Sequence, residues 1–216
     1  MICTISSSRP KGHHFPLSII SYAVWAYHRF ALSLRDVEDL LAERGVTVSY
    51  ETIRAWVGKF GSRIAKQIRA KRKPPSDKWH LDEVVITIRG VKHWLWRALD
   101  SNGVVLDILV QTRRNTRAAK RFISRLMARW GTPRVIVTDK LRSYGVALGK
   151  LEVKVDRRAH KDLNNRIEGS HRSTRKREKI QGRFKSARQA QTFLSAHDET
   201  ANLIRPGRNK LTASEY

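Results

Sequence analysis

Residues 133–139 of the 216-residue chain read PRVIVTD, and the prediction of the fold starts from this stretch. Val135, Ile136 and Val137 are apolar and β-branched, which is typical of a short strand buried on both faces of a sheet. The strand runs into Asp139, and a carboxylate is costly to bury unless a cation lies beside it. We therefore expect Asp139 to have a function, and we expect other carboxylates to share it.

Three β-rich runs precede this strand. They are WHLDEVVITIRG (79–90), VKHWLWRALDSNG (91–103) and VVLDILVQTRRN (104–115), and RG and SNG stand where tight turns are expected. The pattern predicts an antiparallel meander of three strands. TRAAKRFISRLMARWG (116–131) follows, with apolar residues at the spacing of an amphipathic helix that Gly131 ends.

The remaining segments continue this series of strands and helices. The sequence predicts a short helix over 141–149, a strand in LEVKV (151–155), a densely basic helix from about residue 162 to 181, and a last amphipathic helix over 186–204. The order β-β-β-α-β-α-β-α-α is that of the ribonuclease H-like fold. We therefore predict an α/β catalytic domain, with a mixed sheet flanked by helices, over residues 79–216.

The N-terminal third has helical periodicity instead. One helix ends at Gly45, and Ser49 can cap the next helix after a short turn. The apolar stripe of that second helix comprises Ile53, Trp56, Val57 and Phe60. Two helices joined in this way form the helix-turn-helix pattern. We assign residues 17–69 to a small all-α DNA-binding domain, preceded by a flexible basic N-terminus (1–16) and followed by a linker (70–78).

The open side of the second helix carries Tyr50, Arg54 and Lys59. In a helix-turn-helix domain these side chains would meet base edges or phosphates. The alternative is an ordinary three-helix bundle that makes no DNA contact.

The charge of the chain points to a polyanionic partner. Lys and Arg number 44 and Asp and Glu 19, which leaves a formal net charge of +25. Nucleic acid is the leading candidate, and an anionic membrane surface is the alternative. No apolar run approaches the ~20 residues of a membrane span, and no secretory signal is recognisable. With Cys3 as its one cysteine, the chain has no internal disulfide and no cysteine zinc cluster, which indicates a reducing cytoplasm.

Three carboxylates are candidates for a metal site. Asp82 lies in the first strand and Asp139 ends the fourth, and these strands are neighbours in a ribonuclease H-like sheet. Two carboxylates held so close repel one another unless a divalent cation lies between them. Glu168, on the basic helix, is the best-placed third ligand. Glu83 follows Asp82 directly and so faces the other side of the strand. Two Mg²⁺ or Mn²⁺ ions held by such a trio would suit phosphodiester chemistry.

A basic strip accompanies Glu168 on its helix. His171, Arg172 and Arg175 follow it at the spacings that place residues on one helical face. We expect this strip to contact DNA phosphates, and a merely solvated basic helix is the alternative.

These segments together resemble the DDE transposases of bacterial insertion sequences, of the IS-six family. The resemblance rests on SDKWHLDEV (76–84), PRVIVTDKLRSYG (133–145) and LNNRIEGSH (163–171), among other stretches, and covers nearly the whole chain. The chain departs from the family pattern at Arg157 and Ala159, where relatives commonly have His and Gln.

The resemblance implies an Asp-Asp-Glu triad of Asp82, Asp139 and Glu168 that uses Mg²⁺. It also implies a helix-turn-helix domain that binds the terminal inverted repeats of the element. The implied reaction is strand transfer, in which a 3′-hydroxyl at the element end attacks a phosphodiester of target DNA. The implied active form is an oligomer in the bacterial cytoplasm, associated with the nucleoid.

Two other functions compete with a transposase. One is a helix-turn-helix regulator without catalysis, which would not need the three carboxylates to converge. The other is a different ribonuclease H-like nuclease, which would cleave nucleic acid without joining it.

Overall fold

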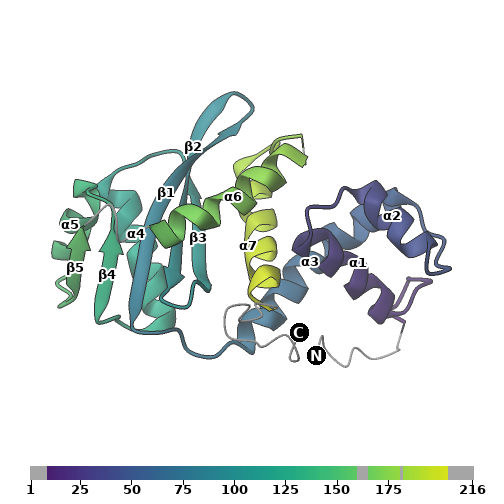
Figure 1. Cartoon of the computed structure of the whole chain (residues 1–216), viewed down its shortest axis with the longest axis horizontal. Coiled ribbons are helices and arrows are strands. Elements are labelled where there is room, and N and C mark those ends of the chain that lie inside the picture. Colours follow the sequence, from purple (N-terminus) through teal and green to yellow (C-terminus); the bar gives the residue numbers. More distant parts are fainter. Residues whose placement is uncertain (1–8, 160–164, 181, 204–216) are drawn as a thin grey trace, which may run out of the picture. The chain divides into compact units, whose positions relative to one another are not determined.

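The computed structural model describes residues 9–159, 165–180 and 182–203 (Figure 1). These residues form two compact units. One contains residues 72–195, and the other contains residues 9–71 together with 196–203. No helix in the described ranges combines the length and the apolar character that crossing a bilayer requires.

The larger unit is built on one five-stranded sheet. Its strands are β1 (Lys78–Ile88), β2 (Val91–Asp100), β3 (Val105–Gln111), β4 (Val135–Thr138) and β5 (Asp156–Ala159), in the spatial order β3-β2-β1-β4-β5. The first three strands are antiparallel, whereas β4 runs parallel to β1 and β5 runs parallel to β4. The helices of this unit are α4 (Thr116–Trp130), α5 (Arg142–Gly149), α6 (Asn165–Ile180) and the first half of α7 (Ala187–Leu203). This order and topology confirm the predicted ribonuclease H-like fold.

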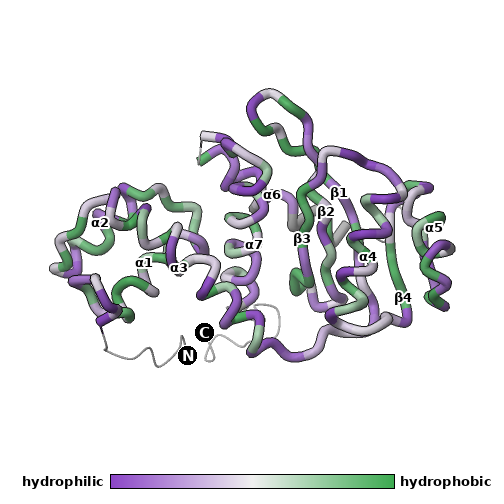
Figure 2. The backbone as a smooth tube through the Cα atoms, turned by 180° about the vertical axis from the view of Figure 1, so that it is seen from behind, coloured by the Kyte–Doolittle hydropathy of each residue, from purple (hydrophilic) through white to green (hydrophobic). Residues whose placement is uncertain are grey.

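The core of this unit lies between the sheet and the pair of helices α4 and α5. All four residues of β4 are buried, and the strand is hydrophobic along most of its length in Figure 2. Trp96 of β2 is fully buried and contacts the rings of Phe122 on α4 and Tyr144 on α5. Helix α6 instead contacts β1 and β2 from the other face. Alternate residues of β1 therefore meet different helices.

The strand expected over 151–155 is misplaced in the sequence prediction. The strand β5 begins only at Asp156, which pairs with Val135 of β4. Val153 and Val155 are partly buried against the core, so they produce an alternating apolar pattern without joining the sheet. The true edge strand, DRRA, is largely exposed and charged, a composition that discourages pairing with another sheet.

The smaller unit begins with α1 (Leu17–Arg29), α2 (Leu34–Ala42) and α3 (Tyr50–Ala70). Gly45 has a φ of 72° just after α2, and the Ser49 hydroxyl accepts a hydrogen bond from the Thr52 amide at the start of α3. The helix, short connection and helix expected from the sequence are therefore present. The stripe of α3 buries Ile53, Trp56 and Phe60, but Val57 is only partly buried.

The second half of α7 belongs with these N-terminal helices. His197 donates from Nδ1 to the carbonyl oxygen of His28 at 2.6 Å, and Arg69 pairs with Glu199 at 2.7 Å. The sequence division assigned the whole of 79–216 to the catalytic domain, whereas the structure groups residues 196–203 with the N-terminal unit.

Candidate active site

Strand register brings Asp82 and Asp139 together. The parallel pairing of β1 with β4 ends at Leu81 and Thr138, so the next residue of each strand is a carboxylate at the same place in the sheet. Carboxylate oxygens of Asp82, Asp139 and Glu83 lie within 4.8 Å of one another. The convergence expected of the two aspartates is therefore observed, and Glu83 is added to it.

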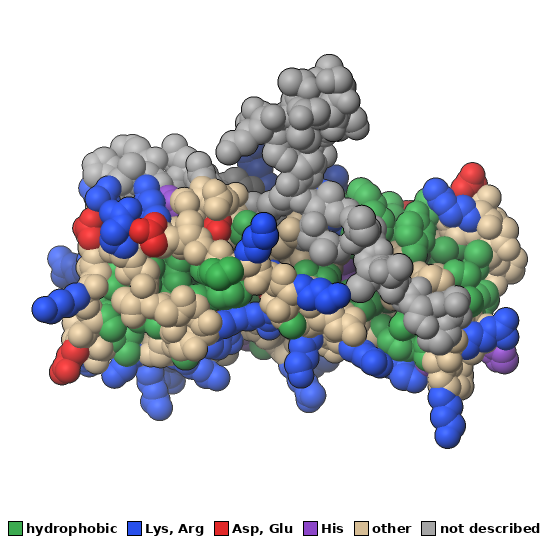
Figure 3. Space-filling model, turned by 90° about the horizontal axis from the view of Figure 1, so that it is seen from below, with side chains coloured by type: hydrophobic (Ala, Val, Ile, Leu, Met, Phe, Trp, Pro, Cys, Tyr) green, Lys and Arg blue, Asp and Glu red, His purple; other side chains and the backbone are tan. Residues whose placement is uncertain are grey.

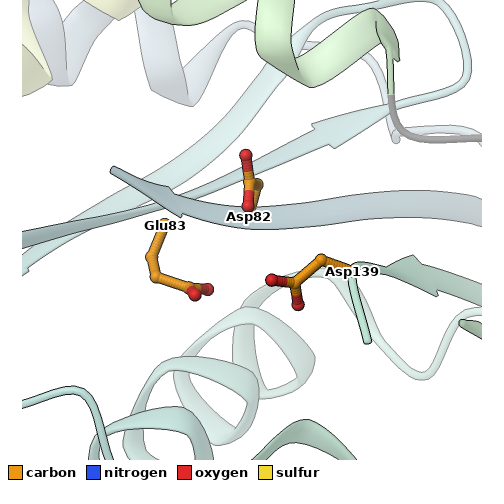
Figure 4. A group of neighbouring side chains, drawn as sticks. All are labelled: Asp82, Glu83 and Asp139. Carbon is orange, nitrogen blue, oxygen red and sulfur yellow. The ribbon is translucent and has the colours of Figure 1, made fainter. Parts of the chain in front are cut away.

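Glu83 belongs to this acidic group although it faces the side of β1 opposite Asp82. Figure 4 shows Asp82 on one side of the strand and the carboxylates of Glu83 and Asp139 pointing toward one another on the other. The Glu83 side chain is fully buried, and its Oε2 accepts a hydrogen bond from the Tyr144 hydroxyl at 2.6 Å. Strand alternation predicted the face of Glu83 correctly but did not reveal that Asp139 would reach back to it.

Burial changes the acid-base behaviour of this pair. Desolvation raises the pKa of Glu83 from 4.5 to about 7, and the hydrogen bond from Tyr144 opposes that rise. The charge of Asp139 adds to the rise, and Arg114 opposes it. Burial also raises the pKa of Tyr144 well above its ordinary value, with Glu83 contributing in the same direction. Tyr144 therefore remains a protonated donor to Glu83 at neutral pH.

Arg114 lies between the two carboxylates on this side. It follows β3, and its guanidinium is 4.8 Å from the centre of the Trp94 ring. Its Nη2 is 2.5 Å from Glu83 Oε1 and 3.3 Å from Asp139 Oδ2. The other oxygen of Asp139 accepts from the Leu141 amide at 3.0 Å. The sequence analysis missed Arg114, because one arginine in a chain so rich in them carries no local signal.

The opposite side of β1 is covered by α6. His171 Nε2 is 3.0 Å from Asp82 Oδ2, and the His171 side chain is 8% exposed. His171 therefore contacts the carboxylate rather than facing solvent, where a DNA phosphate would reach it. Arg172 and Arg175 are exposed, as a phosphate contact requires. Glu168 lies on α6 one turn before His171, but its side chain is outside the described part of the structure.

A buried arginine of β2 holds α6 beside Asp82. Arg97 is the cross-strand partner of Asp82 on β2 and is 1% exposed. Its Nη1 donates to the Thr174 hydroxyl of α6 at 2.9 Å. The position of α6 over Asp82 is thus fixed by contacts of His171 and Thr174, one turn apart on the same helical face.

Comparison with known proteins identifies the family. A family model described as a DDE domain matches residues 76–206. The transposase for the insertion sequence-like element IS431mec of Staphylococcus aureus (strain Mu50) is 34% identical over 202 residues, covering 91% of this chain and 89% of that protein. The transposase for the element IS257 in transposon Tn4003 of Staphylococcus aureus matches with the same identity and coverage. The chain belongs to the DDE transposases of the IS-six family.

Membership decides among the three functions considered from the sequence. The chain is a transposase with a DDE catalytic domain, and not a regulator that merely carries a helix-turn-helix. Among solved structures, the catalytic core domain of BIV integrase in crystal form I is similar with a TM-score of 0.47 and 19% identity, covering 61% of this chain and 87% of that chain.

The three DNA-binding candidates of the transposase's N-terminal unit all lie on α3. Arg54 and Lys59 are exposed, and Tyr50 is half-buried. Arg54 pairs with Glu51 at 2.9 Å and lies over the Tyr50 ring, whereas Lys59 Nζ is 2.9 Å from Nε2 of His13. Over the face shown in Figure 3, Lys and Arg side chains are far more common than Asp and Glu. A surface of this charge suits a polyanion.

Proposed function

We propose that this transposase catalyses metal-dependent DNA strand transfer with Asp82, Asp139 and Glu168 as its catalytic triad. The observation that carries the proposal is the approach of the Asp82 and Asp139 carboxylates at the end of the β1–β4 ladder. Of the two, Asp82 faces α6, the helix that bears Glu168. The function of the family and this geometry support each other, because a regulator needs neither carboxylate.

The donor set fits a hard divalent cation. Carboxylate oxygens are the ligands that Mg²⁺ and Mn²⁺ prefer, and grouped carboxylates repel one another without a cation. We propose that Asp82, Asp139 and Glu168 hold two such ions. When bound, the ions would activate the attacking oxygen and stabilise the leaving oxygen of the phosphodiester.

The chain's own residues prepare this site. His171 orients the Asp82 carboxylate from α6, and the Leu141 amide orients that of Asp139. Arg114 balances the charge of Asp139 and Glu83. In the proposed reaction a 3′-hydroxyl of the element end attacks a target phosphorus, one P–O bond forms and one breaks, and the target strand leaves as a new 3′-hydroxyl. The number of phosphodiester bonds is unchanged, so no external energy source is needed.

We propose DNA and a second copy of the chain as partners. Residues 17–69 would bind the terminal inverted repeats, with Tyr50, Arg54 and Lys59 of α3 reaching bases or phosphates. Arg172 and Arg175, exposed on α6, would bind phosphates beside the catalytic triad. The active form would be an oligomer, because the two ends of the element must be held together, and it would act at the bacterial nucleoid.

The test is a joining assay with purified protein. Labelled duplexes carrying the sequences that flank the reading frame are incubated with supercoiled target plasmid and Mg²⁺ or Mn²⁺. Asp82→Ala, Asp139→Ala and Glu168→Ala should each abolish joining but leave binding to the duplex ends within about twofold, since binding rests on the other unit. Asp156→Ala, which removes an exposed carboxylate paired with Arg158, is the matched control. Wild-type levels of joining in any triad variant would remove that residue from the site.

A further inference from the structure

Helix α6 and strand β1 are held together at two separate places. At one place His171 contacts Asp82, and at the other Phe184, just beyond α6, forms a parallel bridge with Ile88 at the end of β1. At ~3.3 Å per residue, the strand from Asp82 to Ile88 is about 20 Å long. The path from His171 along α6, at ~1.5 Å per residue, and through the turn to Phe184 is similarly about 20 Å. The helix therefore leads from the carboxylates to the tip of the β1–β2 hairpin (Figure 1).

Two turns meet at this far end, and both are basic. The hairpin presents Arg89 in its turn and Lys92 at the start of β2, and the turn after α6 presents Arg183 and Lys185. All four are exposed. None of the four forms an ion pair with a carboxylate in the described ranges. We call these residues the two-turn cluster. Four unpaired cations on adjacent turns repel one another, and a polyanion relieves that repulsion.

The backbone at this cluster is strained at its arginines. Among the described residues, three that are not glycine have positive φ, and two of them are Arg89 at 49° and Arg183 at 74°. The left-handed region is unfavourable for a residue with a Cβ, and a two-residue hairpin turn is better served by Asn-Gly than by Arg-Gly. A positive φ at such a residue raises the hypothesis that its side chain has a use, and here both side chains are guanidinium groups at exposed tips.

Exposed cations also occupy the path between the cluster and the carboxylates. Arg175 and Lys179 of α6 are both exposed. A duplex whose reacting phosphate lay at Asp82 and Asp139 could therefore meet cations along about 20 Å, which is about six base pairs at 3.4 Å each.

We propose that the two-turn cluster binds the sugar–phosphate backbone of duplex DNA about six base pairs from the reacting phosphate. This inference rests on the proposed strand-transfer function and extends it with a contact at the far end of α6. The contact is independent of base sequence, because Lys and Arg neutralise phosphates and the arginine fork can take a phosphate in two hydrogen bonds. The same chemistry is offered by target DNA and by the DNA of the element end.

The variants that test this contact remove charge and strain together. In the full-length chain, Arg89→Gly and Arg183→Gly each delete a cation at a position whose φ suits glycine, so the folded state is retained. Glu152→Gly is the matched control, because Glu152 has a φ of 53° and no cation. Arg134→Ala controls for the loss of one exposed arginine elsewhere, at the residue just before β4. Thermal unfolding should show no loss of stability in the glycine variants.

The first measurement is the salt dependence of binding to a random-sequence duplex. The slope of log K against log salt should become shallower by ~0.9 for each lost phosphate contact, hence by ~1.8 in the Arg89→Gly/Arg183→Gly double variant. The rate of DNA joining by the double variant should fall by about tenfold. In the Glu152→Gly control, neither the salt slope nor the joining rate should change. A wild-type salt slope together with a wild-type joining rate in the double variant overturns the inference.

The second measurement locates the contact. Phosphate ethylation interference is carried out separately on the labelled target and on the labelled element end. In one of the two DNAs, ethylation of a phosphate about six base pairs from the joining point should interfere with binding of the wild-type protein but not of the double variant. The DNA in which this occurs is the one that the cluster binds. Interference unchanged in both overturns the inference. If the wild-type protein fails to join DNA, the proposed function falls, whereas the salt slope still tests the cluster by itself.

Discussion

Asp82 and Glu83 are consecutive residues of β1, yet they lie in opposite environments. The Asp82 side chain is 17% exposed and meets His171 of α6, whereas Glu83 is fully buried between Tyr144 and Arg114 on the α4–α5 side. One strand thus presents one carboxylate that a metal ion and DNA could reach and one that is enclosed by protein donors. We infer that the helices packed on the two faces of β1, and not the residue type, distinguish the proposed metal ligand Asp82 from its enclosed neighbour Glu83.

The first test neutralises Asp82 and Glu83 separately and compares the loss of DNA joining. Asp82→Asn should lower joining on the order of 10³-fold or more, because a ligand of the proposed metal site is lost. Glu83→Gln keeps the shape and the hydrogen bond from Tyr144, and joining should fall by about tenfold at most. DNA joining is measured for each variant, together with the rise in unfolding temperature that Mn²⁺ causes. Asp82→Asn should abolish this rise, and Glu83→Gln should preserve it. The reverse order of effects would exchange the roles of the two carboxylates.

Arg114 tests the same difference, because the carboxylates that it contacts, Glu83 and Asp139, lie on the side of β1 opposite Asp82. Arg114→Ala removes the cation between Glu83 and Asp139, so Asp139 is less firmly placed, and joining should fall by about tenfold, or ~1.4 kcal/mol of transition-state stabilisation. Arg113→Ala, one residue away and also exposed, should stay within about twofold of wild type. Equal rates in the two variants would show that the ion pairs of Arg114 have no role in joining.

Tyr144 provides a test of stability on the same side. Tyr144→Phe leaves the ring packing in place but removes the hydroxyl that donates to the buried Glu83. The free energy of unfolding should fall by ~1–3 kcal/mol, the cost of leaving a buried acceptor without its donor. Urea denaturation measures this change. The double variant Tyr144→Phe/Glu83→Leu serves as the control, because removing both polar groups should recover part of the loss.

The last test of this side of β1 is the pH dependence of stability in the presence of a chelator. Because burial raises the pKa of Glu83 from 4.5 to about 7, the folded state holds a proton that the unfolded state releases. The stabilisation from this group is therefore complete below about pH 4.5 and is lost as the pH rises through about 7. Glu83→Gln should flatten the unfolding free energy over this window relative to wild type. Parallel curves for the two proteins would mean that Glu83 is ionised throughout.

Local patterns were sufficient to predict most of the fold. The strand Val135–Thr138, with its three apolar residues, and the hairpin turn at Arg89 and Gly90 depend on nearest neighbours, and both appear where they were expected. The prediction of a strand over 151–155 is wrong for the opposite reason. Its alternating valines do face the core, but backbone pairing with β4 begins only at Asp156, and a partner strand distant in the sequence decides that register.

Residue periodicity was enough to predict the order of the elements and the opposite faces of Asp82 and Glu83 on β1. The expectation that Asp82 and Asp139 meet also needed the strand order of the predicted fold. The surroundings of these carboxylates depend on tertiary packing. Arg114 lies after β3, Tyr144 on α5 and His171 on α6, far from Asp82 and Glu83 along the chain. Their contacts follow from how α5, α6 and the segment after β3 pack on the sheet. Packing of this kind depends on side chains brought together from distant segments, which no local pattern encodes.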